Sequence, residues 1–253
     1  MRVVSYFLAA AAGAVLATAV MGYLPAGRTQ QSLSVGQTKA VEGLIGDYLG
    51  KHPELVEKAL DQLQAEQKTA AQDATRKTIQ DKASELFHDP ADQVMGNPQG
   101  DVTVVEFFDY RCPYCKRVTP TLTDALKSDG HIRLVLKEFP ILGPNSVLAS
   151  HAAIAAIKQG KYAAFHLALL ASPAALDEAS IMAIAQASGL DTARLAQDMK
   201  DPAIEALIKK NYALAQALKI DGTPAFIVGD ELVPGALDRS ALEDLVKQAR
   251  SKG

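Results

Sequence analysis

The feature that most constrains this chain is a pair of cysteines placed where a predicted strand ends and a predicted helix begins. Residues Val102–Phe108 are β-branched or aromatic apart from Glu106, which is typical of a buried strand. Cys112-Pro113-Tyr114-Cys115 follows, and residues 112–127 are predicted to form a helix. The first turn of a helix has unpaired N–H groups and the positive end of the helix dipole, and both stabilise a thiolate. We therefore expect Cys112 to be an acidic, reactive thiol and Cys115, one turn further along, to be its partner in a disulfide.

These are the only two cysteines of the chain, so disulfides do not hold the fold together. The pair is either redox-active or half of a metal site. His88, His131, His151 and His166 show no spacing typical of zinc ligands, so no metal site is expected. Copper capture by the two thiols remains an alternative. As a redox pair, Cys112 would attack the substrate and Cys115 would resolve the mixed disulfide, with no cofactor beyond the Cys112–Cys115 disulfide itself.

The N-terminus has the pattern of an export signal. Arg2 precedes an apolar, Ala-rich run that reaches Leu24, and Ala17-Thr18-Ala19 offers a small-x-small cleavage site. Residues 1–24 are thus predicted to be a signal peptide cut after Ala19, or an uncleaved membrane anchor, and both readings stay open. Either one places most of the chain in the periplasm, where disulfides persist.

A helical region is predicted between the N-terminal segment and the cysteines. Residues 25–38 are rich in Gly, Gln, Ser and Thr and are expected to be a linker, and residues 39–94 a helical extension. Residues 40–50 favour a short helix, and residues 53–87 one long helix free of Gly and Pro. Apolar residues of that helix recur at steps of three and four, which resembles the seam of a coiled coil. A homo-oligomer through residues 53–87 and a solvated spacer helix are both compatible with this pattern.

The rest of the chain alternates strands and helices, which predicts an α/β fold. Residues 89–100 are expected to be a loop, and residues 132–138 a second strand. Residues 146–218 show only helical patterns. A hairpin then follows at residues 225–228 and 231–233, and a last helix at residues 240–250 with Ser240 as its cap.

Two motifs of this sequence resemble those of the DsbA family of bacterial disulfide oxidoreductases. They are Val105-Glu106-Phe107-Phe108-Asp109-Tyr110-Arg111-Cys112-Pro113-Tyr114-Cys115-Lys116 and Gly222-Thr223-Pro224-Ala225-Phe226. The resemblance covers about residues 95–250. It implies a thioredoxin fold with an inserted α-helical domain at about residues 145–219, preceded here by the helical extension. It also implies a cis peptide bond between Thr223 and Pro224, whose backbone would bind substrate, with Pro113 and Tyr114 tuning the redox potential and contacting substrate.

Glu106 and Lys137 are charged residues within predicted strands. An acid in an apolar strand is costly unless it has a task or a partner. Glu106 resembles the buried acid of the family, which assists proton movement at the resolving cysteine, and Lys137 is expected as its charge partner. Two solvated charges at strand edges are the alternative interpretation.

The resemblance extends to function. It implies an exported enzyme that oxidises or isomerises disulfides in unfolded or misfolded envelope proteins and is reset by a membrane redox partner. The long N-terminal helix, the Pro-Tyr dipeptide and Thr223 are similar to ScsC-like isomerases. A non-catalytic module that binds peptide or copper, and an envelope-tethering assembly protein, remain alternatives. The net charge of −3 disfavours nucleic acid as a partner.

Overall fold

The computed structural model describes residues 33–252, which belong to two compact units, residues 33–64 and residues 65–252. The predicted signal peptide or anchor at residues 1–24 and the first part of the predicted linker lie outside the described residues. In residues 33–252, no helix is both long enough and apolar enough to cross a membrane.

The first unit consists of helix α2 (Val35–Lys51) and the beginning of helix α3 (Pro53–Asp81). Ser34 caps α2, because its hydroxyl accepts from the N–H of Gln37 while the Gln37 side chain accepts from the N–H of Ser34. This capping box starts the helix before residue 40, so residues 35–38, predicted to be linker, are helical. Pro53 occupies the first position of α3, where its missing N–H costs nothing.

The prediction of one helix over residues 53–87 is wrong, because α3 ends at Asp81 and a separate short helix, α4, covers Ala83–Phe87. The carbonyl groups of Glu85 and Phe87 in α4 accept hydrogen bonds from the side chains of Lys137 and Arg133. Both cations lie on strand β3 (Ile132–Glu138), so the sheet binds α4 directly.

A mixed five-stranded sheet in the order β1-β3-β2-β4-β5 forms the centre of the second unit. Strand β2 (Val102–Phe108) runs parallel to β3 and antiparallel to β4 (Ala225–Val228), and β4 forms a hairpin with β5 (Glu231–Pro234). The expected loop over residues 89–100 contains strand β1 (Gln93–Gly96), antiparallel to β3. Because only four residues pair and Gly96 turns the chain at φ +76°, this strand has no recognisable apolar pattern.

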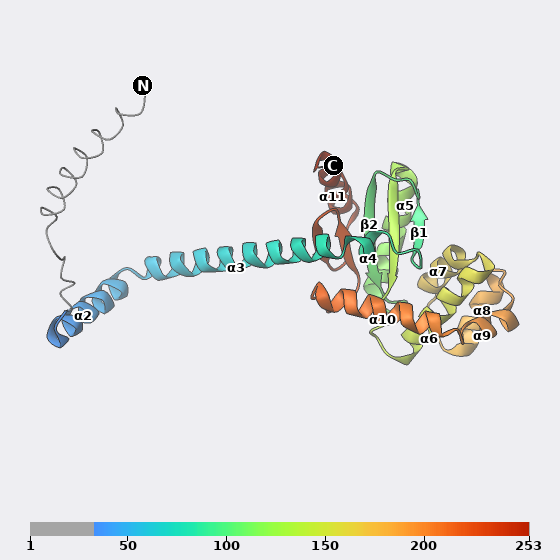
Figure 1. The fold of residues 1–253 in the computed structure, drawn as a ribbon, viewed down its shortest axis with the longest axis horizontal. Helices are drawn as coiled ribbons and strands as arrows, with labels where there is room; N and C mark the ends of the chain where they lie inside the picture. Colours follow the sequence, from blue (N-terminus) through green and yellow to red (C-terminus); the bar gives the residue numbers. More distant parts are fainter. Residues whose placement is uncertain (1–32, 253) are drawn as a thin grey trace, which may run out of the picture. The chain divides into compact units, whose positions relative to one another are not determined.

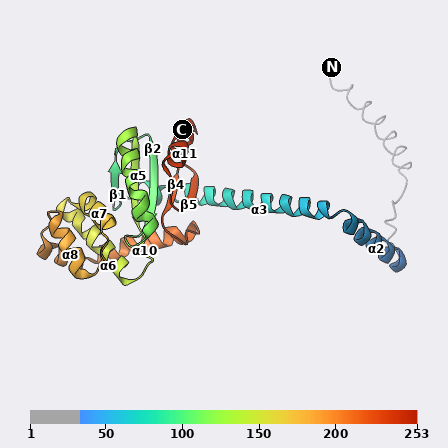
Figure 2. The ribbon, with the colours of Figure 1, turned by 180° about the vertical axis from the view of Figure 1, so that it is seen from behind.

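Helices cover both faces of the sheet, and a further group gathers at one end of it (Figure 1, Figure 2). Helices α5 (Pro113–Asp129) and α11 (Arg239–Lys252) pack on one face, while α4 and α10 (Pro202–Ala217) pack on the other. This is a thioredoxin fold with an inserted helical domain, as the sequence predicted.

The inserted domain keeps the five helical segments expected from the sequence, and one of them ends in a 3-10 turn. They are α6 (Pro144–Ala155) with η2 (Ala156–Gln159), α7 (Tyr162–Ala171), α8 (Glu178–Ala187), α9 (Thr192–Asp198) and α10. Asp238, not Ser240, caps α11, because its carboxylate accepts from the N–H of Ala241 at 2.8 Å and from the Ser240 hydroxyl.

Candidate active site around the cysteine pair

Cys112 stands at the N-cap of α5, directly after the turn Asp109-Tyr110-Arg111 that leaves strand β2. The buried carboxylate of Asp109 accepts from the N–H groups of Arg111 (2.7 Å) and Leu142 (2.9 Å) and from the Ser146 hydroxyl (2.8 Å). These bonds tie the turn to the start of the helical domain and so position Cys112. Asp109 is not among the residues predicted from the sequence, although an Asp that can accept from the N–H two residues on is a recognisable turn signal.

The thiol of Cys112 lies against Thr223, with its sulfur 3.1 Å from the Thr223 carbonyl oxygen. The Thr223–Pro224 peptide bond is cis, as expected. A hydrogen bond from the Cys115 thiol is the largest effect that lowers the pKa of Cys112, to about 5. Hydrogen bonds from the Thr223 side chain and from the backbone N–H groups of Cys115 and Tyr114 also lower this pKa, while burial opposes them. Cys112 is therefore a thiolate at neutral pH.

The pKa of Cys115 is shifted in the opposite direction, although Cys115 lies in the same helical turn as Cys112. Its side chain is fully buried and both cysteines are free. The pKa of Cys115 is raised far above its ordinary value, first because its thiol donates to Cys112 and then because of burial and the charge of Glu106. The pair thus contains one thiolate and one protonated thiol, the division that an attacking and a resolving cysteine require.

Glu106 lies on β2 with only 2% of its surface exposed. Among the described residues its Oε1 has no hydrogen-bond partner. Burial, and secondarily the charge of Cys112, raises the pKa of Glu106 to about 8. Because the charge of Glu106 raises the pKa of Cys115, this carboxyl group is near enough to affect the proton of Cys115.

The expected pairing of Lys137 with Glu106 is wrong. Lys137 lies opposite Phe107 in the sheet, and neighbouring residues of a strand point to opposite faces, so Lys137 and Glu106 are on different faces. Lys137 is fully buried and instead pairs with Asp92 and donates to the carbonyl of Glu85 at 2.6 Å. Burial raises the pKa of Asp92 to about 6 and lowers that of Lys137, and the contact between them opposes both shifts.

A second buried carboxyl group, unforeseen in the sequence, lies behind the turn that carries Cys112. Glu138 Oε1 accepts from the hydroxyls of Tyr110 (2.9 Å) and Tyr162 (2.8 Å), and Oε2 accepts from Ser150 (2.7 Å). His166 Nδ1 lies 3.0 Å from the Tyr110 hydroxyl. Burial raises the pKa of Glu138 to about 8, against the effect of these hydrogen bonds. The network joins the end of β3 and helices α6 and α7 to the turn before Cys112.

A groove of about 460 Å³ lies beside Pro224. Of the four predicted substrate-binding residues, Tyr114, Thr223 and Pro224 line it, whereas Pro113, the first residue of α5, does not. Tyr114 is 54% exposed, so its ring is available to a bound molecule. We call this cavity the Pro224 groove. It brings the N-terminus of α5 and the β4–β5 hairpin to one site.

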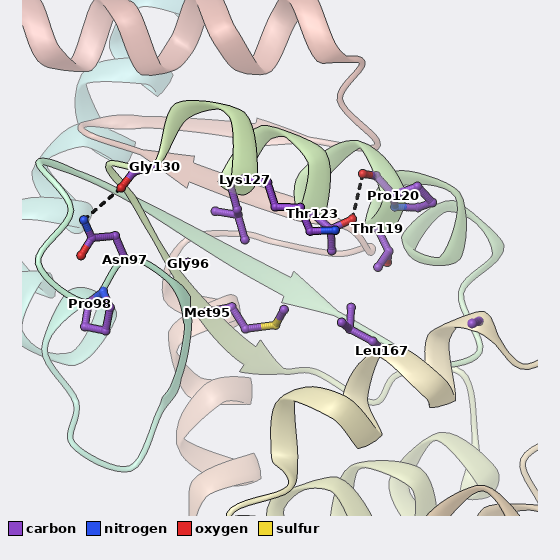
Figure 3. Close-up of a pocket in the computed structure, with 12 residues that line it drawn as sticks. Met95, Gly96, Asn97, Pro98, Thr119, Pro120, Thr123, Lys127, Gly130 and Leu167 are labelled. Atoms are coloured by element: carbon purple, nitrogen blue, oxygen red, sulfur yellow. Dashed lines mark hydrogen bonds between the residues drawn. The ribbon is translucent and has the colours of Figure 1, made fainter. Parts of the chain in front are cut away.

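A larger cavity than the Pro224 groove lies elsewhere, between α5, β1 and α7 (Figure 3). Its volume is about 770 Å³ and its walls are mostly apolar, with Met95 and Leu167 on the side away from α5. The hydroxyls of Thr119 and Thr123 bond to backbone carbonyls of α5 itself. Neither cysteine lines this cavity, so size alone does not identify the reactive site.

Within residues 33–252, no group of three or more His, Cys, Asp or Glu side chains is placed to hold a metal ion. The two sulfurs would be the only soft ligands that a metal could meet at this site.

Comparisons with known proteins agree with this geometry. The family described as "DSBA-like thioredoxin domain" matches residues 103–247, and the family described as "Copper resistance protein ScsC N-terminal domain" matches residues 37–70. Among curated proteins, the chain is 31% identical over 160 residues to a Na⁺/H⁺ antiporter NhaA of Salinispora tropica. The alignment covers 62% of this chain but only 24% of the antiporter, so the chain spans about a quarter of that relative's length.

Three solved structures are similar to the chain. A thioredoxin-like oxidoreductase from Silicibacter pomeroyi is 49% identical, covering 66% of this chain and 97% of that protein, with a TM-score of 0.65. A linker-deletion mutant of ScsC from Proteus mirabilis is 29% identical, covering 89% and 100%, with a TM-score of 0.68. A periplasmic thioredoxin-like protein from Salmonella enterica serovar Typhimurium is 31% identical, covering 67% and 95%, with a TM-score of 0.61.

Proposed function

Because this chain belongs to the family of DsbA-like thioredoxin domains, we propose that it is a thiol–disulfide oxidoreductase whose reactive pair is Cys112 and Cys115. The observation that carries the proposal is the opposite acidity of the two thiols. The pKa of Cys112 is lowered to about 5, while that of Cys115 is raised. The attacking thiol, Cys112, is thus already ionised, and the resolving thiol, Cys115, stays protonated until the mixed disulfide has formed.

The exchange proceeds in two displacements. The Cys112 thiolate attacks one sulfur of a substrate disulfide, a Cys112–substrate bond forms, and the second substrate sulfur leaves as a thiolate. Cys115 then loses its proton and attacks the Cys112 sulfur, which releases the remaining substrate thiolate and closes the Cys112–Cys115 disulfide. Two electrons pass from the pair to the substrate, and the reverse sequence oxidises a substrate. In an isomerisation, a substrate thiolate displaces Cys112 instead.

In this proposal, Glu106 accepts the proton that Cys115 loses in the second displacement. Cys115 must lose its proton before it can attack, and its raised pKa makes this the slow event. Glu106 is the buried acid whose charge acts on Cys115, and its own pKa of about 8 suits a group that accepts and returns a proton near neutral pH.

Its substrates are unfolded or misfolded exported proteins, and a membrane redox partner resets the pair. The N-terminal pattern of residues 1–24 supports export to the periplasm. The similarity to a periplasmic thioredoxin-like protein supports the same compartment.

Substitution of each cysteine tests the assignment. Cys112→Ser is expected to abolish the reduction of insulin disulfides, and Cys115→Ser to accumulate mixed disulfides that mass spectrometry detects. Full insulin reduction by Cys112→Ser would refute the assignment. A wild-type protein that binds peptide or copper without any exchange would favour the non-catalytic binding module instead.

We also propose that the chain assembles with copies of itself through its first unit, as an isomerase would. The supporting observation is an unusual density of exposed large apolar residues in that unit. They are Leu33, Val35, Val41, Leu44, Ile45, Tyr48, Leu49, Leu55, Val56, Leu60 and Leu63.

Many of these side chains repeat at steps of three and four along α2 and α3, which is the spacing of a helical seam. A second copy of the same helices is the partner that such a seam fits, because it offers the matching apolar row. Since exposed apolar side chains cluster before Gln64, we place the contact in residues 35–63 rather than in the whole of residues 53–87. Assembly would hold several reactive pairs in one particle, which suits isomerisation.

A further inference from the structure

We propose that the Pro224 groove selects substrates whose reacting cysteine lies in an acidic segment, and that Lys219 at the groove reads this negative charge. The proposal rests on the exchange activity proposed above and names the substrate class for it. Its starting point is the backbone conformation of Lys219, which lines the groove together with Tyr114 and Pro224.

Lys219 occupies a position that glycine normally fills. The N–H of Ile220 donates to the carbonyl of Ala215 at 2.8 Å, and the N–H of Lys219 donates to that of Gln216 at 3.1 Å. These two bonds are the Schellman motif that ends α10, and its left-handed residue is Lys219 at φ +57°. A residue with a Cβ atom is strained in this region of φ, whereas glycine is not.

The Schellman hydrogen bonds need a left-handed residue at this position, but they do not need a lysine side chain. Lys219 is exposed, and in residues 33–252 its ammonium group has no carboxylate within ion-pair distance and no hydrogen-bond acceptor. A strained residue that the fold does not need is a candidate for function. Lys219 lines the groove to which Thr223, the neighbour of the Cys112 sulfur, also belongs, so its exposed ammonium group is available to meet a negative charge on a bound substrate.

Other cations around Cys112 are also left without carboxylate partners. The guanidinium of Arg117 lies 4.6 Å from the ring centroid of Tyr114, which lines the groove. Arg111 donates to the Leu142 carbonyl, and Lys116 to the Ser172 carbonyl, so neutral acceptors hold both. Asp221 is the one acid among the residues that line the groove. Lys219 is the one base among those lining residues, so an acidic segment in the groove would meet Lys219 and, beside Tyr114, Arg117.

These cations are not needed to ionise Cys112. The largest effects that lower the pKa of Cys112 are hydrogen bonds from Cys115, Thr223 and backbone N–H groups. The positive charges of Lys219, Arg117, Arg111 and Lys116 can therefore act on the approaching substrate. A substrate of complementary charge associates faster.

The test compares two peptides that differ only in the four residues flanking a single cysteine, Asp in one and Lys in the other. Each carries the same chromogenic thiol in a mixed disulfide, and stopped-flow absorbance follows its release by the reduced full-length protein. We expect the acidic peptide to react about three- to tenfold faster at low ionic strength. The preference should fall as salt is added, because the Debye length is only about 10 Å at 0.1 M.

Lys219→Gly should remove most of the preference while leaving the melting temperature unchanged or higher, because glycine suits the left-handed position. Lys219→Arg should keep the preference. Lys200→Gln, which removes another exposed cation at the end of α9, serves as the control and should change neither rate. Equal rates for the two peptides, or a preference that survives Lys219→Gly, would overturn the proposal. No exchange with either peptide would instead contradict the proposed function.

Discussion

Cys112 and Cys115 share one turn of α5 and differ in acidity because of what surrounds each sulfur. Cys112 receives hydrogen bonds from the Cys115 thiol, from Thr223 and from backbone N–H groups. Cys115 donates its proton to Cys112 and is enclosed by the core, close to Glu106. One thiolate in the pair makes ionisation of the second costly, so the asymmetry is a property of the pair rather than of either residue.

From the raised pKa of Glu106 we predict how the unfolding free energy depends on pH. The folded chain holds the Glu106 proton more tightly than the unfolded chain, so between pH 4.5 and about 8 the folded state carries more protons. The stabilisation is fully present below pH 4.5 and is lost as the pH rises towards 8. Glu106→Gln removes this loss, and its unfolding free energy relative to the wild type should rise with pH by at most about 1.4 kcal/mol per unit.

Urea unfolding of the reduced proteins at several pH values across that range measures the difference. The slope is the readout, because any packing cost of the new amide is independent of pH. Glu138 is present in both proteins, so its own titration cancels. A difference that stays constant with pH would show that Glu106 is not protonated in the folded state. The same variant should slow resolution by Cys115, as seen in the lifetime of the mixed disulfide.

Sequence reasoning identified Glu106 as buried but assigned it the wrong neighbour. Residues 106 and 137 both lie in buried strands, and their register decides which face each one meets. A shift of one residue in register exchanges the two faces of a strand, and no local pattern reports that register. Asp92, the actual partner of Lys137, comes from a segment predicted to be a loop.

Helix α3 is exposed along its first part and packs in the core near its end, and this explains why its apolar pattern changes. Its early apolar residues are exposed, including Leu60 at 53%, whereas Ile79 near its end is only 2% exposed. Ile79 packs with Leu86 of α4 and with Val105 and Phe107 of β2 in the core on the α10 side of the sheet. Ile79 does not continue the three-and-four spacing of Val56, Leu60 and Leu63, because this part of the helix packs against the sheet.

Ile79→Ala should therefore destabilise the catalytic unit by about 2–5 kcal/mol, since it leaves a cavity in a closed core. Gln80→Ala, one residue away and exposed, is the matched control and should change the unfolding free energy by no more than about 0.5 kcal/mol. Urea unfolding of the wild type and the two variants measures these differences in unfolding free energy. A loss below about 1 kcal/mol for Ile79→Ala would mean that α3 does not contribute to the core.

At the scale of the whole molecule, the proposed seam predicts self-association. Leu60→Asp places a charge in the apolar row of α3, and we expect the full-length protein to fall from an oligomer to a monomer in light scattering. Thr69→Asp makes the same change of charge on an exposed position on the opposite face of the same helix, nine residues after Leu60, and should leave the oligomer intact. A wild-type protein that is monomeric at micromolar concentration would end the proposal.

The same variant separates assembly from chemistry. Because Leu60 belongs to the first unit and the reactive pair to the second, Leu60→Asp should still reduce insulin. Its isomerisation of a scrambled disulfide protein should fall with the loss of the oligomer. Unchanged isomerisation by the monomer would show that a single reactive pair suffices.

The sequence by itself determined the features that depend on neighbours along the chain. Strands β2 and β3, the cysteine pair at the start of α5 and the helical pattern of residues 146–218 follow from local patterns of apolar, β-branched, Gly and Pro residues. The cis Thr223–Pro224 bond was expected from the resemblance of two motifs to the DsbA family. Only the tertiary structure decided which charges meet. Three contacts join residues far apart in the sequence: Lys137 with Asp92, Glu138 with Tyr110, and Asp109 with Leu142. The ammonium group of Lys219, in contrast, is left exposed. Such contacts depend on sheet register and helix packing, which bring distant residues together and leave no periodic signal in either segment.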